Sequence, residues 1–102
     1  MFGLERPATR DSRRVTRALH SANVLDQVVE AQLPLIARLP EDSRRRAADY
    51  LAELVMLAQA YRHHASGWIT RRELERRGLA AADKLAELRR HRPRPAQFTE
   101  QD

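Results

Sequence analysis

The 102-residue chain contains no cysteine and only one lysine, Lys84. Without cysteine it has no disulfide framework, no thiol nucleophile and no thiolate metal ligand. No catalytic signature, metal site or cofactor loop is recognisable, and no polar residues are placed to converge on a substrate. We therefore expect a protein that is not an enzyme and that uses no cofactor, no metal and no small-molecule substrate.

Long apolar runs are also missing. No segment is apolar over the length that a transmembrane helix needs, and the N-terminus lacks the apolar core of a signal peptide. We expect a cytoplasmic protein that makes no use of a membrane. A chain of 102 residues forms one small domain with a modest core, so its stability is expected to depend on long helices or on oligomerisation.

Arginine is the residue type that is abundant, because eighteen of the nineteen basic side chains are arginine and the net charge is +5. The guanidinium group is a planar, permanently charged donor that suits phosphate and carboxylate. A GC-rich genome would also favour arginine over lysine, so the clustering of the arginines is stronger evidence than their number. Four clusters occur, namely Arg13, Arg14 and Arg17; Arg44, Arg45 and Arg46; Arg71, Arg72, Arg76 and Arg77; and Arg89, Arg90, Arg92 and Arg94.

Apolar residues recur at spacings of three and four from Val15 to Leu39, which predicts a long first helix. They form a heptad seam whose single polar member is Gln32, and a second apolar stripe runs beside that seam. So wide an apolar face predicts contact with more than one neighbouring helix. The seam is Val15, Ala18, Ala22, Leu25, Val29, Gln32, Ile36 and Leu39, and the second stripe is Val24, Val28, Ala31 and Leu35.

Two further signals concern the ends and the interior of this first helix. Asp11 or Ser12 is suited to cap its start, because a short polar side chain can accept a hydrogen bond from the first turn. Pro34 lies inside the apolar pattern and predicts either a kink or a brief break followed by a restart.

A second helix is expected from Pro40, which suits a first helical position, with Glu41 and Asp42 at the positive end of its dipole. A helix this apolar belongs in the middle of a bundle or at a subunit interface. Met56 lies on its sparse polar side and is expected to be exposed unless a partner covers it. The residues expected to be buried are Ala47, Tyr50, Leu54, Leu57 and Tyr61, flanked by Leu51, Val55 and Ala58.

The connection to a third helix carries the clearest local signals. Gly67 is placed to end the second helix in the left-handed conformation, with Trp68 folded back on the last turn. Thr70 and Glu73 have the spacing of a capping box, which predicts that the third helix starts at Thr70. The matching hydrophobic staple is formed by Ile69 and Leu74.

The third helix either runs unbroken to about His91 or splits at Gly78, and both alternatives stay open at this point. Three helices of similar length with short connections predict an all-α, antiparallel three-helix bundle, which we expect to be oligomeric. The expected organisation is a flexible N-terminal arm at 1–10, a helical bundle domain at 11–92 and an extended or disordered tail at 93–102. The apolar stripe of the third helix is Leu74, Gly78, Ala81, Leu85 and Leu88.

Two segments resemble known motifs but lack their functional residues. The segment from Ile69 onward resembles the start of a helix-turn-helix, but its recognition helix would begin with three alanines and Asp83, which cannot read base edges. The segment from Arg62 to Glu73 has the spacing of a calcium-binding EF-hand loop without its early acidic ligands. We interpret both as parts of an ordinary helical bundle and expect no calcium.

The aromatic residues Tyr50, Tyr61 and Trp68 lie on one stripe of the second helix and its cap. Such residues can stack on nucleic-acid bases. At helical spacing they are more often core residues, and we interpret them as core.

An antiparallel bundle would concentrate basic charge at both of its ends. Residues 10–17 and 62–77 would meet at one end, with nine basic and three acidic side chains. Residues 38–46 and 88–94 would meet at the other, with eight basic and two acidic side chains. The waist between them would carry one basic residue, Lys84, and six acidic ones, Asp26, Glu30, Asp49, Glu53, Asp83 and Glu87.

This distribution favours a non-catalytic helical accessory protein that binds the backbone of nucleic acid, independently of sequence, within an oligomer or a larger nucleoprotein complex. The candidate binding residues are the arginines of the four clusters up to Arg90. The alternative is a regulator or inhibitor that docks on an acidic partner protein through apolar helix faces and basic ends. The candidate oligomer or partner interface is formed by Val24, Val28, Leu35 and Met56.

Overall fold

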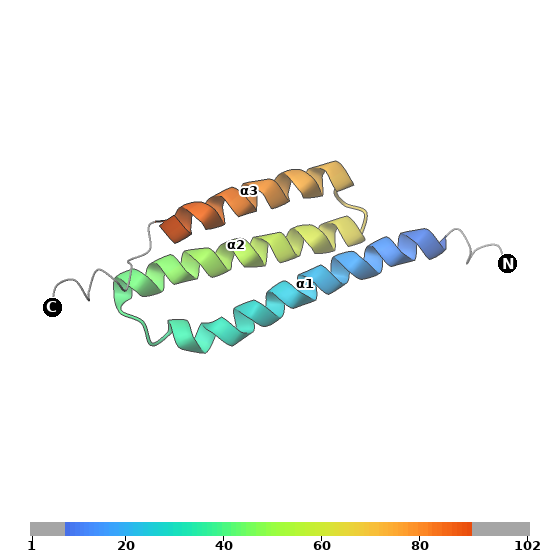
Figure 1. The fold of residues 1–102 in the computed structure, drawn as a ribbon. Helices are drawn as coiled ribbons and strands as arrows, with labels where there is room; N and C mark the ends of the chain where they lie inside the picture. The colour runs from blue at the N-terminus through green and yellow to red at the C-terminus, as the bar shows by residue number, and fades with distance from the viewer. Residues whose placement is uncertain (1–7, 91–102) are drawn as a thin grey trace.

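The computed structural model describes residues 8–90, which form three α-helices: α1 (Ala8–Ile36), α2 (Glu41–Ala65) and α3 (Arg71–Arg90). No residue in this range belongs to a β-strand, so the all-α prediction with three helices is confirmed. The chain reverses direction at each of the two connections (Figure 1). The predicted arm and tail lie outside the described residues, apart from residues 8–10, which are helical.

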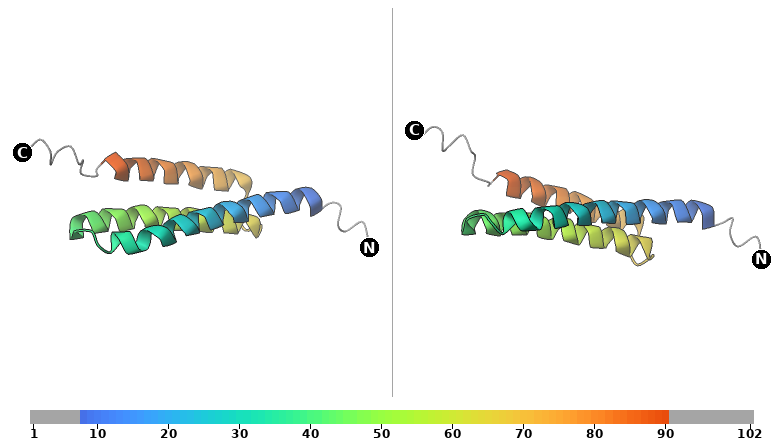
Figure 2. Two further views of the ribbon diagram at one scale, coloured as in Figure 1. Left: turned by 60° about the horizontal axis from the view of Figure 1, so that its bottom comes forward. Right: turned by 90° about the horizontal axis from the view of Figure 1, so that it is seen from below.

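Helix α2 occupies the central position in the fold. It packs along both α1 and α3, whereas α1 and α3 barely contact each other. Figure 2 shows the same arrangement from two further directions, with α1 crossing α2 at an angle. Because α1 and α3 do not pack together, the surface of α2 that lies between them stays open.

One of the two apolar stripes of α1 faces α2. Ala18, Ala22 and Ile36 of the heptad seam are buried, and Leu25 and Val29 are half-buried. The whole second stripe, Val24, Val28, Ala31 and Leu35, is exposed. Within the single chain α1 packs mainly on α2, because α3 packs on α2 rather than on this stripe.

The core of the described residues is small and consists mainly of alanine. Five of its eight buried residues are alanines, and the large members are Ile36, Leu51 and Leu54. No polar side chain among the described residues is buried. Alanines let helices approach closely, but each one removes little apolar surface from water. Ten large hydrophobic side chains in turn stay at least 37% exposed.

Burial along α2 differs from the sequence-based expectation. Leu54 is buried as predicted, but Tyr50, Leu57 and Tyr61 are only half-buried. The buried positions instead include Leu51 and Ala58, which were expected to flank the stripe, and Ala60. The reason is that α1 and α3 cover two sides of α2 and leave the strip between them open. Met56 is 60% exposed, as predicted.

The ends of α1 also differ from the prediction. The helix begins at Ala8, so Asp11 and Ser12 lie inside it and cannot cap its start. It continues through Pro34 and ends at Ile36, so there is no break and restart at the proline. After Ile36 the chain closes with turn hydrogen bonds, in which the backbone N–H of Leu39 donates to the carbonyl of Ile36 over 3.0 Å.

Pro40 occupies the N-cap position of α2 rather than its first helical position as predicted, because α2 begins at Glu41. Its fixed φ of −57° lies in an extended conformation with ψ 159°, and its carbonyl accepts the backbone N–H of Arg44 over 2.7 Å. Glu41 and Asp42 occupy the first turn, as predicted, where the helix dipole favours negative charge.

The end of α2 confirms the predicted left-handed cap. Gly67 has a φ of +83°, which is strained for any residue with a side chain. The N–H of Gly67 donates to the carbonyl of His64, and the N–H of Trp68 donates to that of His63. These two bonds form a complete Schellman motif. Its usual side-chain contact is made by His63 and Trp68, whose ring centroids lie 5.1 Å apart.

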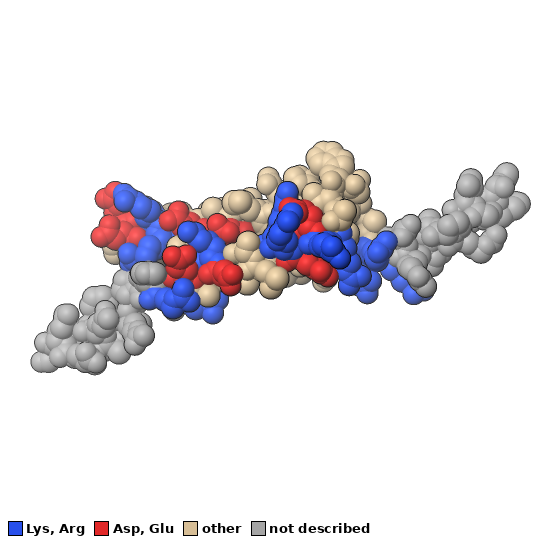
Figure 3. Space-filling model, turned by 90° about the horizontal axis from the view of Figure 1, so that it is seen from above, with Lys and Arg blue, Asp and Glu red and all other residues tan. Residues whose placement is uncertain are grey.

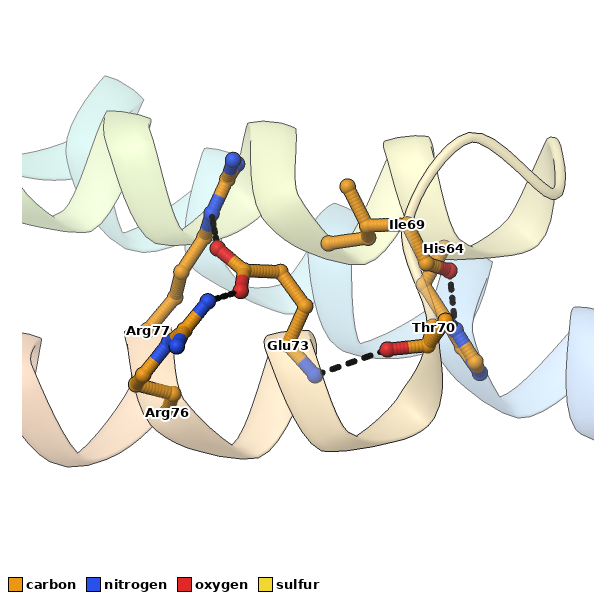
Figure 4. Close-up of polar contacts among 6 residues, drawn as sticks. All are labelled: His64, Ile69, Thr70, Glu73, Arg76 and Arg77. Atoms are coloured by element: carbon orange, nitrogen blue, oxygen red, sulfur yellow. Dashed lines mark hydrogen bonds and ion pairs between the residues drawn. The ribbon is translucent and has the colours of Figure 1, made fainter.

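The start of α3 contains half of the predicted capping box (Figure 4). The backbone N–H of Glu73 donates to Oγ1 of Thr70 over 3.0 Å, which satisfies one of the free donors of the first turn. The side chain of Glu73 instead contacts Arg76 and Arg77. Ile69 and Leu74, the predicted staple, are both half-buried.

Helix α3 is continuous through Gly78, which settles the two alternatives in favour of an unbroken helix. The backbone of Gly78 has no positive φ, and a Cβ atom added there would meet nothing within 4 Å. Gly78 therefore destabilises α3, because glycine is a poor helix former. No close contact within the single chain requires a residue without a side chain at this position.

We predict opposite effects for the same substitution at the two glycines. Gly78→Ala should raise the free energy of unfolding by about 0.5–1 kcal/mol, because alanine is the better helix former and fits the available space. Gly67→Ala should lower it by about 1–2 kcal/mol, because alanine is strained at positive φ. Urea unfolding followed by circular dichroism measures both, and a loss of stability in Gly78→Ala would contradict the open space at that position.

Candidate nucleic-acid interface at the two basic ends

The first basic end is formed by residues 12–17 of α1 and residues 62–77 of α2, the connection and α3. A hollow of about 270 Å³ lies at this end and is lined by side chains from all three helices. Arg14 and Arg17 of α1 face it together with Arg71 of α3, so two arginine clusters that are distant in sequence meet here. The remaining lining residues are Ala18, Ser21, Tyr61, His64 and Leu74.

Several arginines of this end pair with glutamates on their own helix. Arg71 contacts Glu75 over 3.5 Å, and Glu73 pairs with both Arg76 and Arg77 (Figure 4). Such exposed pairs within a helix contribute only about 0.3–0.5 kcal/mol each, so a phosphate group can displace them at little cost. Arg71, Arg76 and Arg77 therefore stay available to an anionic ligand.

Other arginines of the same end are not paired with a carboxylate of the residues that the structure describes. Arg13, Arg17 and Arg72 are exposed and form no ion pair with any residue that the structure describes. Arg62 behaves differently, because it pairs with Asp26 and donates to Oδ1 of Asn23 over 3.3 Å. Counting Arg62 with the basic end is therefore wrong, since it neutralises an acid of the waist and connects α2 to α1.

Two ring side chains border this end. Nδ1 of His64 lies 3.2 Å from the carbonyl oxygen of Ile69, so this bond fixes the ring beside the hollow (Figure 4). Trp68 is 74% exposed, and the interpretation of this residue as core is wrong. Its ring lies against that of His63, the contact that accompanies the Schellman motif. Tyr50 and Tyr61 are half-buried.

The second basic end is formed by residues 38–46 and by residues 88–90 of α3. Nη1 of Arg44 donates to the carbonyl of Leu39 over 3.4 Å, and Arg45 pairs with Glu41 over 3.3 Å. These local contacts give partners to Arg44 and Arg45, which lie near the start of α2, where the helix dipole disfavours positive charge. Arg89 and Arg90 lie in the last turn of α3, where that dipole favours cations.

Arg46 differs from its two neighbours in sequence. Its Nε atom is buried and has no hydrogen-bond partner in the structure. Together with Arg89 it lines a larger groove, of about 640 Å³, between the three helices. The structure thus brings the cluster at 44–46 and the cluster at 89–90 to the same end.

The waist between the two ends is acidic and largely unpaired. Asp26 pairs with Arg62, and Lys84 lies 4.0 Å from Glu87. Within residues 12–90, no ion pair is formed by Glu30, Asp49, Glu53 or Asp83. Figure 3 shows basic side chains dominating one face towards the start of α1, and acidic ones mixed with them towards the opposite end. On this face the first basic end therefore presents the more continuous positive surface.

The predicted apolar interface residues do not form one surface. Val28 and Leu35 line the groove at the second basic end, and Val24 lies one helical turn before Val28 on the same exposed stripe. Met56 follows the buried Leu51 by five residues, which places it about 140° away around α2. It does not line the groove, so it belongs to a different face of the molecule.

Residues 8–90 contain neither a candidate metal site nor a candidate membrane-spanning helix. No three His, Cys, Asp or Glu side chains of this range lie close enough together to hold a metal ion. None of the three helices combines the length and the apolar character that crossing a bilayer requires.

Comparison with known proteins adds no assignment. No protein-family model, curated protein or solved structure matches the chain.

Proposed function

We propose that the protein is a non-catalytic helical accessory protein that binds the backbone of nucleic acid, independently of sequence, through arginines at the ends of an antiparallel bundle. It acts as part of an oligomer or of a larger nucleoprotein complex. The observation that carries this proposal is the hollow of the first basic end, where Arg14 and Arg17 of α1 lie with Arg71 of α3.

The chemistry of this end suits phosphate. Guanidinium groups from two helices converge on one hollow, so that a phosphate placed there can contact more than one of them. Arg13, Arg17 and Arg72 are not neutralised by a described carboxylate, and the pairs of Arg71, Arg76 and Arg77 are local to one helix and weak. Contacts of this kind release counterions and carry no information about sequence.

Trp68 adds a second element to the proposed surface. Its ring is exposed in the connection between α2 and α3, three residues before Arg71 and four before Arg72 in the sequence. An exposed aromatic ring beside basic side chains is the arrangement on which unpaired bases stack. We propose that single-stranded or unpaired segments gain this contact in addition to the phosphate contacts.

A second candidate function is docking on an acidic partner protein. The observation that favours it is the outer face of α2, where Met56 is 60% exposed and the adjacent Val55 is 39% exposed. Methionine adapts its shape to a partner surface, and the basic ends would steer an acidic protein towards it. This face is separate from the hollow, so the two candidate functions can be tested independently.

Removing charge from the hollow should weaken nucleic-acid binding. The variant Arg14→Gln/Arg17→Gln/Arg71→Gln should lower the affinity for duplex DNA and reduce the salt slope of log K by about 2–3, close to 0.9 per lost phosphate contact. Fluorescence anisotropy of a labelled duplex over a range of salt concentrations measures both quantities.

The matched control for this variant is Lys84→Gln, which removes a cation from the acidic waist and should leave the salt slope unchanged. Circular dichroism verifies that both variants stay helical. If the unmodified chain fails to bind duplex DNA or structured RNA at low salt, the proposed function is wrong.

Loss of the exposed ring should affect single strands selectively. Trp68→Leu should weaken binding to single-stranded DNA by about tenfold, which corresponds to the lower part of the range for stacking of one base, and should change duplex binding little. Since Trp68 is the only tryptophan, quenching of its fluorescence by single-stranded DNA reports the contact directly in the unmodified chain. Equal losses for both nucleic acids would rule out stacking.

The second candidate function predicts a protein that co-purifies from native cells after nuclease treatment. Met56→Glu should abolish that association, because the charge would be buried against the partner. Exchange of Leu79 for glutamate, at a position on α3 that is 71% exposed, is the control and should retain it. Retention of the partner by Met56→Glu, measured by quantitative mass spectrometry, would exclude this face as the docking site.

A further inference from the structure

His64 lines the hollow of the first basic end but has no part in the phosphate contacts described so far. It is half-buried in the last turn of α2. The charged and titratable side chains that share the hollow with it come from all three helices, namely Arg14 and Arg17 of α1, Tyr61 of α2 and Arg71 of α3. None of the described lining residues is acidic, and Glu75, which pairs with Arg71 over 3.5 Å, does not line the hollow. A ligand in this hollow therefore meets the imidazole ring among cations and uncharged groups.

One of the two ring nitrogens of His64 is engaged within the protein. Nδ1 lies 3.2 Å from the carbonyl oxygen of Ile69. A carbonyl oxygen only accepts hydrogen bonds, so Nδ1 has to carry the hydrogen in this contact. In the neutral ring the other nitrogen, Nε2, is then an acceptor with a lone pair. Figure 4 shows this second nitrogen on the side of the ring away from Ile69, so Nε2 is the nitrogen left for a ligand.

The charge of His64 decides how Nε2 meets a phosphate. In the neutral ring its lone pair faces a phosphate oxygen, which is also an acceptor, and no hydrogen bond can form. Once protonated, Nε2 donates a charge-assisted hydrogen bond to that oxygen, while Nδ1 keeps its bond to Ile69. A phosphate held by the arginines brings negative charge into the same hollow, which favours the protonated ring. Phosphate binding and proton uptake therefore strengthen each other by linkage.

The other histidines are placed differently. His20 is exposed on α1 and does not line the hollow, and the ring of His63 lies against that of Trp68. His91 lies outside the described residues. Arginine side chains stay cationic and tyrosine side chains stay neutral between about pH 5 and pH 8, whereas histidine changes its charge there. A change of charge among the lining residues over this range is therefore a change at His64.

We infer that His64 is a phosphate ligand of the first basic end and that its protonated ring donates from Nε2 to the phosphate that the arginines of α1 and α3 attract. This inference rests on the proposed function and adds a regulation to it, because it links nucleic-acid binding to a proton taken from solvent. No covalent bond of the nucleic acid changes. The affinity is highest where histidine is protonated and falls as the pH rises through the range in which histidine loses its proton.

The affinity for a labelled DNA duplex, measured by fluorescence anisotropy at constant ionic strength between about pH 5.5 and pH 8, tests the proton linkage. The unmodified chain should bind about tenfold more tightly at the acidic limit, which corresponds to the lower part of the range for a hydrogen bond to a charged group. His64→Gln should bind with the weaker affinity at every pH, because the amide cannot gain a charge. The matched controls His20→Gln and His63→Gln should retain the pH dependence of the unmodified chain.

A second variant separates the charge of His64 from a structural role of its ring. His64→Arg carries a permanent positive charge, so it should bind the duplex tightly over the whole pH range and show no pH dependence. Circular dichroism verifies that His64→Gln and His64→Arg stay helical. If both variants lose affinity equally, the ring acts by shaping the connection after α2 and the inference is wrong.

Nuclear magnetic resonance of the imidazole ring tests the geometry directly. In the unmodified chain at alkaline pH, the nitrogen–proton correlation spectrum of His64 should show its hydrogen on Nδ1, because the carbonyl of Ile69 accepts it. Saturating DNA duplex should move the titration midpoint of this ring to higher pH by about one unit, which is the counterpart of the tenfold change in affinity. A hydrogen on Nε2 at alkaline pH, or a midpoint that the duplex leaves in place, contradicts the inference.

The outcomes separate this inference from the proposed function. Duplex binding that is equally tight at both limits of the pH range overturns the inference and leaves the proposed function intact. A pH dependence that persists in His64→Gln assigns the proton to another group and also overturns it. If the unmodified chain binds no duplex DNA or structured RNA at low salt at any pH of the range, the proposed function fails and the inference fails with it.

Discussion

The close contact of α2 with α1 and α3 is the constraint on which the rest of the structure depends. It is made largely through alanines, which allow the helix backbones to approach but contribute little apolar burial. The larger residues Ile36, Leu51 and Leu54 supply one compact cluster near the second basic end. Because α2 takes part in both contacts, α1 and α3 are held apart, and the surface between them becomes a hollow at one end and a groove at the other.

The distribution of charge follows from the same arrangement. Helix–helix contacts of this type leave the long side chains outside, so the charged residues lie along the surface and do not enter the core. The pairs formed by Glu41, Glu73 and Glu75 are local to one helix and weak, whereas the pair of Arg62 with Asp26 joins two helices. The arginines therefore gather at the ends of the helices. At the first basic end, two arginine clusters that are distant in sequence meet.

The features that were predictable from the sequence are those encoded within a few residues. The left-handed cap at Gly67 and the cap at Thr70 are examples, since both depend on backbone groups at most six residues away. The meeting of Arg14 with Arg71 was predictable from the helix lengths. Three features were not predictable, because they depend on how the neighbouring helices are placed around α2. They are the exposure of Trp68, the exposed second stripe of α1 and the pairing of Arg62 with Asp26. A periodic apolar pattern indicates which faces are suited to burial, but it does not say whether a neighbour covers them.

The two caps that join α2 to α3 have a consequence for how the chain folds. Every hydrogen bond that shapes this connection links residues no more than five positions apart. Closing so short a loop costs little chain entropy, and contacts that are local in sequence form quickly. The α2–α3 hairpin is thus a unit held by contacts that are local in sequence, and the α1–α2 connection, closed by hydrogen bonds of equally short range, forms a second such unit.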